Sequence, residues 1–161
     1  MCFCIALGCR EQEAAKLKWD DVDFKAGSVT FKHTKNHRTH TLPMGAWLKN
    51  LIAKRHSEAR SIFVFPANNK YGHVKNHRKS ILSIRKRSKV EFTLHDLRRT
   101  FASIVNHQLS RSFSLYTIKR LLNHSGDVTS GYIQFGIEDL RDPMQLIESY
   151  VLKCAGIEES K

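Results

Sequence analysis

One amphipathic helix constrains the fold of this chain more than any other feature. The stretch TLHDLRRTFAS begins at Thr93, and Asp96 follows three residues later, which forms a capping box and predicts a helix start. Apolar side chains recur at helical spacing and define a stripe that faces a core: Leu94, Leu97, Phe101, Ile104 and Val105. We therefore expect a well-anchored helix over 94–108. His95 and Arg98 lie three residues apart on a different face of its first turn.

The remaining pattern predicts a mostly helical α+β protein with a small three-stranded antiparallel sheet near the N-terminus. Residues 21–44 alternate and are rich in β-formers, with turns at KAG and KNHR that would separate the strands. Residues 62–67 (IFVFPA) predict a short buried strand or an extended segment. Helical spacing predicts further helices over the following ranges: 2–18, 45–60, 73–89, about 115–123, about 128–134 and about 139–152.

The chain is strongly basic. Its 161 residues suffice for one domain with a core, and they carry 27 Lys and Arg against 15 Asp and Glu, a formal charge of +12. This balance favours a polyanionic partner, most often nucleic acid. A membrane partner is not expected, because the apolar run MCFCIALGC is too short to cross a bilayer and no basic helix has a Trp, Phe and Leu face. RNA is disfavoured, because the sequence has no aromatic-rich RNP-like strand and no GXXG loop.

The cysteines indicate where the protein works. The four of them form no C-x-x-C pair and no zinc-ligand spacing. Cys2, Cys4 and Cys9 lie in the first apolar run, where we expect buried thiols, and this usage indicates a reducing, cytosolic compartment. The same run has no N-cap before it and lacks the features of a signal peptide. We expect that it lies inside a domain and that the chain is cut from a longer protein; a short protein with a frayed start is the alternative.

Unusual polar side chains occur at four separate places. They are Arg10 with Glu13, Lys35, His95 with Arg98, and His124 with Tyr132. Their order, and the stretches LGCREQEAAKLKWDDVD, TLHDLRRTFAS and LLNHSGDVTSGYIQF, resemble the tyrosine recombinases, the phage-integrase type of site-specific DNA recombinase. The resemblance covers residues 2–135. It rests on four blocks in the right order, because H-x-x-R alone occurs often by chance.

The resemblance implies a transesterification that needs no metal and no cofactor. Tyr132 would be the nucleophile and would form a 3′-phosphotyrosine bond with DNA. His95 would accept the tyrosine proton or assist as a phosphate ligand. Lys35 would protonate the departing 5′ oxygen as general acid, although Lys32 lies only three residues away.

The resemblance also implies how the scissile phosphate is held. Arg10, near the middle of the first predicted helix, and Arg98 would clamp it, because a planar guanidinium contacts two phosphate oxygens at once. His124 would donate a hydrogen bond to the phosphate. Glu13 would orient Arg10 rather than react. The N-terminus of the helix at 94–108 would add partial positive charge.

Other basic side chains are expected to contact the DNA backbone. Few acidic residues lie near the basic helix predicted over 73–89, so a DNA surface is favoured over a solvated charged face. The residues assigned to this surface are Lys32, Arg38, Lys75, Arg78, Lys79, Arg85, Lys86, Arg87 and Arg99. His33, His37 and His40 cluster on the hairpin, but no carboxylate or thiol spacing completes a metal site, so we interpret them as DNA-facing or incidental.

The domain organisation is also an expectation from the resemblance. Residues 1–135 would form a catalytic domain shortened at its N-terminus, and residues 136–161 a helical tail that docks on a neighbouring subunit or on its own domain. The full-length protein would carry a separate N-terminal DNA-binding domain and assemble as a tetramer on double-stranded DNA.

The function expected from these features is site-specific recombination or integration by a phage or prophage integrase. Such an enzyme would act on the nucleoid, in the cytoplasm of a bacterial host. A type IB topoisomerase-like enzyme and a non-catalytic DNA-binding regulator derived from an integrase are the alternatives.

Overall fold

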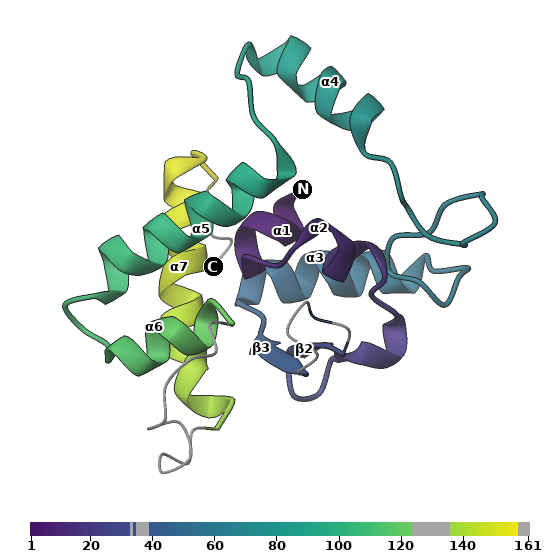
Figure 1. The fold of residues 1–161 in the computed structure, drawn as a ribbon. Helices are drawn as coiled ribbons and strands as arrows, with labels where there is room; N and C mark the ends of the chain where they lie inside the picture. The colour runs from purple at the N-terminus through teal and green to yellow at the C-terminus, as the bar shows by residue number, and fades with distance from the viewer. Residues whose placement is uncertain (33, 35–38, 124–135, 158–161) are drawn as a thin grey trace.

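Helices dominate the fold, and one small sheet accompanies them (Figure 1). This arrangement confirms the predicted α+β class. The computed structural model describes the following parts of the chain: residues 1–32, 34, 39–123 and 136–157. The predicted turn at 35–38 and the predicted helix near 128–134 lie outside these residues.

The predicted three-stranded antiparallel sheet is confirmed. It consists of β1 (Val22–Asp23), β2 (Ser28–Phe31) and β3 (His40–Pro43), paired in the order β1-β2-β3. Gly27 adopts a positive φ of 61° in the turn between the first two strands, a conformation that glycine takes without steric cost.

The first predicted helix is wrong as one continuous element, because the chain turns at Gly8. Helix α1 (Cys2–Leu7) ends there in the left-handed conformation, with φ of 58°. Helix α2 (Glu11–Ala15) begins after Arg10, whose backbone is extended. A Cβ on Gly8 would lie 2.1 Å from Cδ1 of Phe101, so a larger residue has no room. Arg10 therefore lies at the N-terminus of α2 and not in the middle of a helix.

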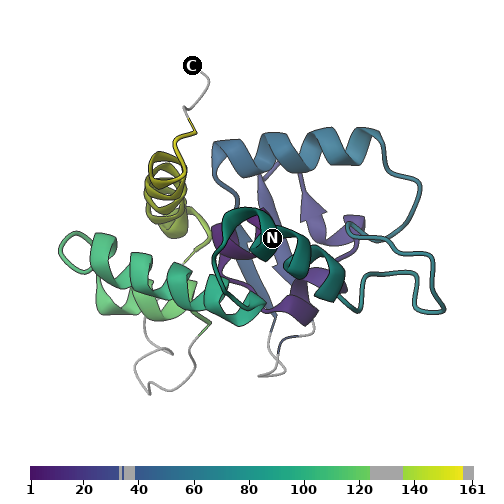
Figure 2. The ribbon, with the colours of Figure 1, turned by 90° about the horizontal axis from the view of Figure 1, so that it is seen from above.

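Helices α5 (Leu94–Leu109), α6 (Leu115–Leu121) and α7 (Arg141–Cys154) form one side of the molecule (Figures 1 and 2). Helix α5 contacts α1, α6 and α7. Its predicted stripe is in the core, since Phe101 and Val105 are 0% exposed. The buried side of α5 therefore anchors the helix against α1, α6 and α7.

The tail helix packs on its own domain. A short 3-10 turn, η3 (Glu138–Leu140), precedes α7, and Leu140, Met144 and Ile147 are at most 2% exposed. Helix α7 contacts α1 and α5. Packing in the same chain is thus the arrangement of residues 136–157, while docking on a neighbouring subunit stays a prediction.

Helix α3 (Ala46–Ser57) connects the sheet to this helical side. It runs along one side of the sheet (Figure 2) and buries Leu48 and Ile52. The backbone N–H groups of Trp47 and Leu48 donate to the two carboxylate oxygens of Glu148 on α7, at 2.8 and 3.0 Å. A buried carboxylate thus satisfies two N–H groups in the first turn of α3.

Helix α4 (Arg78–Ser88) stands away from the rest of the molecule (Figure 1), and none of its residues is buried. The helix predicted over 73–89 begins later than expected. His73 pairs instead with Pro66 in an isolated antiparallel bridge, which keeps the chain extended there.

Between α3 and α4, residues 58–77 form no named helix or strand, and their strand-like pairing is limited to two isolated bridges. A 3-10 turn, η1 (Trp19–Asp21), follows α2, and Lys18 pairs with Phe63 in a second isolated bridge. Val64 beside it is 0% exposed. Residues 62–67 therefore form no named strand, and only Phe63 and Pro66 take part in isolated bridges.

All four cysteines are free thiols. Cys4 and Cys9 are buried as predicted, but Cys2 is exposed, because the first residue of α1 points outward from the core. Across the described parts of the chain, no helix has the length and apolar character needed to cross a membrane.

Candidate active site

Glu13 holds Arg10 at two points. The backbone N–H of Arg10 donates to Glu13 Oε2, and Nη1 of Arg10 donates to Oε1, both at 2.8 Å. The Glu13 side chain is 5% exposed and that of Arg10 is 31% exposed. The carboxylate thus lies inside while part of the guanidinium reaches solvent. This geometry is what an orienting role for Glu13 requires.

Arg98 joins three separate segments of the chain. Its Nη1 donates to the carbonyl of Gly8, after α1, and its Nη2 donates to the carbonyl of Leu122, after α6, at 2.8 Å. Burial lowers the pKa of Arg98, and the positive charge of Arg10 lowers it further, while Glu13 opposes the shift. Since a guanidinium stays charged in proteins, two cations are held close together in a half-buried site. Such a site favours an anion.

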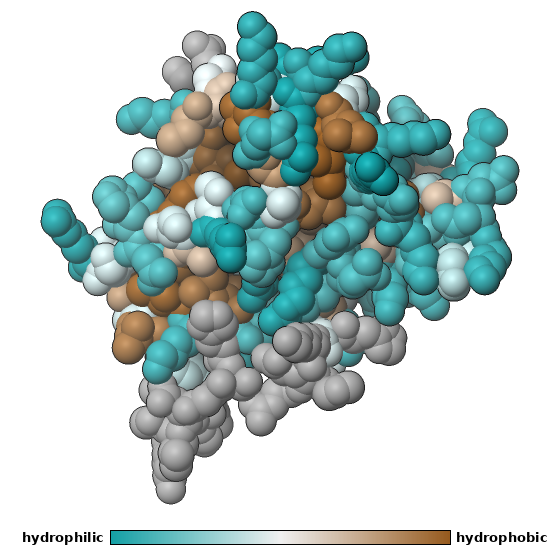
Figure 3. All heavy atoms as spheres, turned by 45° about the horizontal axis from the view of Figure 1, so that its top comes forward, coloured by the Kyte–Doolittle hydropathy of each residue, from teal (hydrophilic) through white to brown (hydrophobic). Residues whose placement is uncertain are grey.

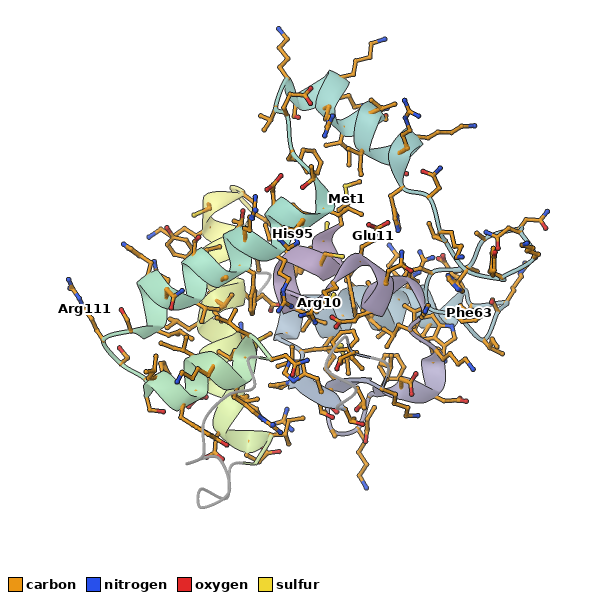
Figure 4. All side chains as sticks on the ribbon, viewed as in Figure 1. Met1, Arg10, Glu11, Phe63, His95 and Arg111 are labelled. Atoms are coloured by element: carbon orange, nitrogen blue, oxygen red, sulfur yellow. The ribbon has the colours of Figure 1, made fainter. Side chains whose placement is uncertain are left out.

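His95 is exposed on the first turn of α5. The predicted capping box is confirmed: Thr93 Oγ1 accepts from the Asp96 N–H at 3.2 Å, and Asp96 Oδ2 accepts from the Thr93 N–H at 2.8 Å. Figure 4 shows His95 and Arg10 near the middle of one view, one from α5 and the other from the α1–α2 turn. Arg98 follows His95 by three residues on α5, and the charge of Arg10 acts on Arg98, so the positive end of the α5 dipole lies near both arginines.

The chain leaves α6 through a left-handed turn at Asn123, where φ is 52°. Asparagine adopts this conformation more readily than other residues except glycine, which explains the residue type just before His124. Because Arg98 binds the carbonyl of Leu122, α5 fixes the position from which the chain continues toward 124.

Lys32 is engaged in an ion pair. Its Nζ lies 2.5 Å from Asp21 Oδ1, and this hydrogen bond raises the pKa of Lys32. A lysine with a raised pKa gives up its proton less readily. The ion pair with Asp21 therefore makes Lys32 a weaker candidate for a general acid than an unpaired lysine.

Of the two interpretations of His40, DNA-facing or incidental, the DNA-facing one is wrong. His40 is 6% exposed, and its ring stacks on Phe31 with 6.5 Å between centroids. Burial is the main cause that lowers the pKa of His40 to about 4. Strand alternation was the available signal, because His40 lies two residues before the buried Leu42 on the same face. In the described residues, no group of three or more His, Cys, Asp and Glu side chains is placed to hold a metal ion.

The basic side chains before and within α4 are mostly exposed. They are Lys75, Arg78, Lys79, Lys86 and Arg87. Hydrophilic side chains project from this part of the molecule in Figure 3, and exposed apolar ones accompany them, including Leu82 and Ile84 of α4. A protruding helix with exposed cations is suited to contact a polyanion.

Two of the predicted DNA-contacting arginines have partners within the protein. Arg85 donates through Nε and Nη2 to the carbonyl of Phe92 and pairs with Glu91 at 2.7 Å, so it connects α4 to the start of α5. Arg99 pairs with Asp96 at 3.2 Å on the surface of α5.

The structure therefore brings together Arg10, Glu13 and Arg98, with His95 one turn from Arg98 on α5. The predicted site residues that lie outside the described part of the chain are Lys35, Arg38, His124 and Tyr132. Their roles stay predictions. Sequence patterns did not single out Gly8, which ends α1 in a left-handed turn and whose carbonyl accepts a hydrogen bond from Arg98.

Known proteins resemble this chain along most of its length. The phage integrase family matches residues 1–134. Tyrosine recombinase XerA of Pyrococcus furiosus is 26% identical over 147 residues, which make up 86% of this chain and 50% of that protein.

Solved structures share the fold. The integrase from mycobacterium phage Brujita superposes with a TM-score of 0.71 at 21% identity, over 91% of this chain and 50% of that one. The Tn1549 transposon integrase, solved in complex with circular intermediate DNA, gives a TM-score of 0.60 at 15% identity, over 89% of this chain and 55% of that one. The chain thus spans about half the length of these relatives. Since the family match extends over most of its residues, the chain belongs to the phage integrase family.

Proposed function

We propose that this protein carries out site-specific DNA recombination through a 3′-phosphotyrosine intermediate, with Tyr132 as the nucleophile. The observation that carries the proposal is the cluster of Arg10, Glu13 and Arg98 beside the N-terminus of α5. Two guanidiniums, one held by a buried carboxylate and one by two carbonyls, form a preorganised site for a single phosphate.

The reaction exchanges one phosphate ester for another. The Tyr132 oxygen attacks the scissile phosphorus and its proton passes to His95, while the bond from phosphorus to the 5′ oxygen breaks. Lys35 gives a proton to that leaving oxygen. Arg10 and Arg98 stabilise the charge that develops on the non-bridging oxygens, and loss of one such donor typically costs about 3–4 kcal/mol of transition-state stabilisation. A second strand's 5′ hydroxyl then reverses the step and rejoins DNA.

The state of Lys32 supports Lys35 as the general acid. Asp21 forms an ion pair with the Lys32 ammonium and raises the pKa of Lys32, which makes proton release from Lys32 less favourable. The exposed cations of α4 would bind the DNA backbone on either side of the cleaved bond.

The chain spans about half the length of these relatives. From the family resemblance, the proposal also includes a separate N-terminal DNA-binding domain in the full-length protein and a tetramer on double-stranded DNA. The likeness to the Brujita integrase supports a phage or prophage origin, and we propose action on the nucleoid of the host cell.

A covalent-trapping experiment tests the proposal. The protein and its Tyr132→Phe variant are mixed with pooled nicked duplexes that lose a short fragment on cleavage, in the presence of a metal chelator. We expect denaturing electrophoresis to show DNA joined to the parent protein only. An adduct with both proteins would reject Tyr132 and point to Tyr116 or Tyr150. A protein that binds the duplexes and forms no adduct would contradict catalysis and favour a DNA-binding regulator.

A further inference from the structure

The chain between α3 and α4 includes a loop that projects from the body of the molecule before α4 begins (Figure 1). We call residues 66–75 the projecting loop. Pro66 pairs with His73 in an isolated antiparallel bridge, and the Ala67 N–H donates to the Gly72 carbonyl at 3.1 Å. The two arms of the loop are therefore joined by backbone contacts, although they form no regular strand.

One side chain fixes the tip of the projecting loop. Asn69 accepts the Tyr71 N–H through Oδ1 at 2.8 Å and donates through Nδ2 to the His73 carbonyl at 2.9 Å. An asparagine that bonds the backbone in this way stabilises a turn. Gly72 adopts a positive φ of 73°, and His73 is buried, with its ring centroid 5.1 Å from that of Phe63. The tip of the loop thus holds Tyr71 in a defined position.

Two lysines gather around Tyr71, which is 45% exposed. The Nζ atom of Lys75 lies 3.7 Å from the centroid of the Tyr71 ring, and that of Lys70 lies 5.1 Å from it. An aromatic face attracts an ammonium group at such distances. Both lysines are exposed, and the sequence has no acidic residue between Glu58 and Glu91. The tip of the projecting loop therefore presents two cations around one ring.

The geometry of the ring and the lysines favours a phosphate over a base as the group contacted. A nucleobase that stacks on an aromatic side chain needs a free ring face. The Lys75 ammonium lies over the Tyr71 ring at 3.7 Å, so that face is occupied. Two ammonium groups, in contrast, suit the oxygens of a phosphate backbone. The projecting loop also leads into α4, whose exposed cations are proposed to bind DNA, so the two surfaces are continuous along the chain.

We propose that the projecting loop is a contact surface for duplex DNA, in which the Tyr71 ring holds the ammonium groups of Lys70 and Lys75 ready for the phosphate backbone. A lysine loses rotamer freedom when it is fixed on a phosphate, and the ring reduces that loss because it orders the side chain beforehand. The inference adds Lys70 and Tyr71 to the DNA surface. It rests on the proposed function in one respect only, namely that the partner is duplex DNA.

Three variants of the projecting loop separate the ring, the hydroxyl group and the charges. Tyr71→Leu removes the ring, Tyr71→Phe removes only the hydroxyl group, and Lys70→Ser combined with Lys75→Ser removes both ammonium groups. Lys54→Ser combined with Lys153→Ser is the matched control, because it removes two exposed lysines from α3 and α7. Each variant should keep the parental unfolding midpoint, since all the replaced side chains are exposed.

Fluorescence anisotropy with an intact duplex measures binding without cleavage. We expect Tyr71→Leu to weaken binding by about two- to fivefold, the equivalent of one exposed cation–π contact, and Tyr71→Phe to bind like the parent. The slope of log binding constant against log salt should fall by about 2 for the Lys70 and Lys75 variant and stay unchanged for the control. Parental affinity of Tyr71→Leu, an equal loss from Tyr71→Phe, or an unchanged slope would overturn the proposal. A larger loss on single-stranded DNA than on the duplex would also overturn it, in favour of base stacking.

The binding assay also separates this inference from the proposed function. If the parent binds the duplex with these variant effects but forms no covalent adduct, recombination is rejected and the DNA-contacting role of the loop stands. If the parent forms the adduct and the loop variants bind as the parent does, the role of the loop is rejected and the proposed function stands. A parent that binds no duplex would reject both.

Discussion

The turn that carries Arg10 and helix α4, which exposes several cations, are built in opposite ways. Around Gly8 the charged side chains have fixed partners: Glu13 binds Arg10 twice, and Arg98 binds the carbonyls of Gly8 and Leu122. Helix α4 buries none of its residues, and Arg85 holds it to the residues just before α5. Under the proposed function, one phosphate must be contacted to a fraction of an ångström and a DNA backbone need not be, which fits the concentration of fixed contacts in the first region.

A substitution at Gly8 should have the largest effect on this contrast. Gly8→Ala would place a methyl group 2.1 Å from Phe101 and force a positive φ on alanine. We expect a loss of about 2–4 kcal/mol in the free energy of unfolding, measured by urea denaturation. Gly156→Ala is the matched control, since Gly156 also has a positive φ of 65° but nothing lies within 4 Å of its Cβ position. Equal losses from both would show that the contact with Phe101 is unimportant.

The next largest effect should be on the pH dependence of the unfolding free energy, through His40 of β3. The pKa of His40 falls from its ordinary 6.5 to about 4 on folding, so its contribution is complete above pH 6.5 and is lost as the pH falls toward 4. The unfolding free energy of the parent should drop between pH 7 and pH 5 by about 2 kcal/mol more than that of His40→Phe. Parallel curves for the two proteins would contradict a buried, neutral His40.

Removal of the Glu13 charge should cost somewhat less. Glu13→Gln leaves Arg10 and Arg98 beside each other without this carboxylate, but Arg10 is about a third exposed, so solvent screens part of the repulsion. We expect about 1–2 kcal/mol of destabilisation in urea titrations. Glu138→Gln, which breaks an exposed pair with Arg141, is the control and should unfold at a near-parental midpoint. The order of these two effects is the test, and a reversed order would contradict the account of the site.

Changes in α4 should have the smallest effect on stability and a clear effect on binding. Replacement of Lys79, Lys86 and Arg87 by serine should leave the unfolding midpoint near that of the parent, because these side chains are exposed. The slope of log binding constant against log salt should fall by about 2–3 if each contacts one phosphate. Salt titrations by fluorescence anisotropy measure this slope, and Lys153→Ser on α7 should leave it unchanged. An unchanged slope for the triple variant would remove α4 from the DNA surface.

Local patterns predicted the elements that depend on local physics. The capping box at Thr93 and the stripe through Phe101 placed α5, and the alternation with turn residues placed the sheet. The break at Gly8 was missed, because an isolated glycine is tolerated in a helix and Phe101, which leaves no room there, lies 93 positions away in the chain. The late start of α4 was missed for a related reason, since the bridge between His73 and Pro66 competes with helix formation.

Some parts of the site could likewise be predicted from the sequence and others could not. Motif order placed Arg10, Glu13, His95 and Arg98 at one site, and the structure supplies the contact between Arg10 and Glu13 and places both charges near Arg98. The carbonyls of Gly8 and Leu122 that orient Arg98 were not predictable, because backbone groups leave no mark on side-chain patterns. His40 was hidden among the other histidines of a basic hairpin.

The central claim of the proposal is that Arg10 and Arg98 stabilise the transition state while α4 contributes DNA binding. Its most direct test is the single-turnover rate of adduct formation as a function of DNA concentration, for Arg98→Lys and for the α4 triple variant. The account predicts that Arg98→Lys lowers the rate at saturating DNA by about 100-fold or more with little change in half-saturation, because an ammonium cannot reproduce the guanidinium contacts. The α4 variant should raise the half-saturation concentration and keep the saturated rate. A parental saturated rate for Arg98→Lys would contradict the claim.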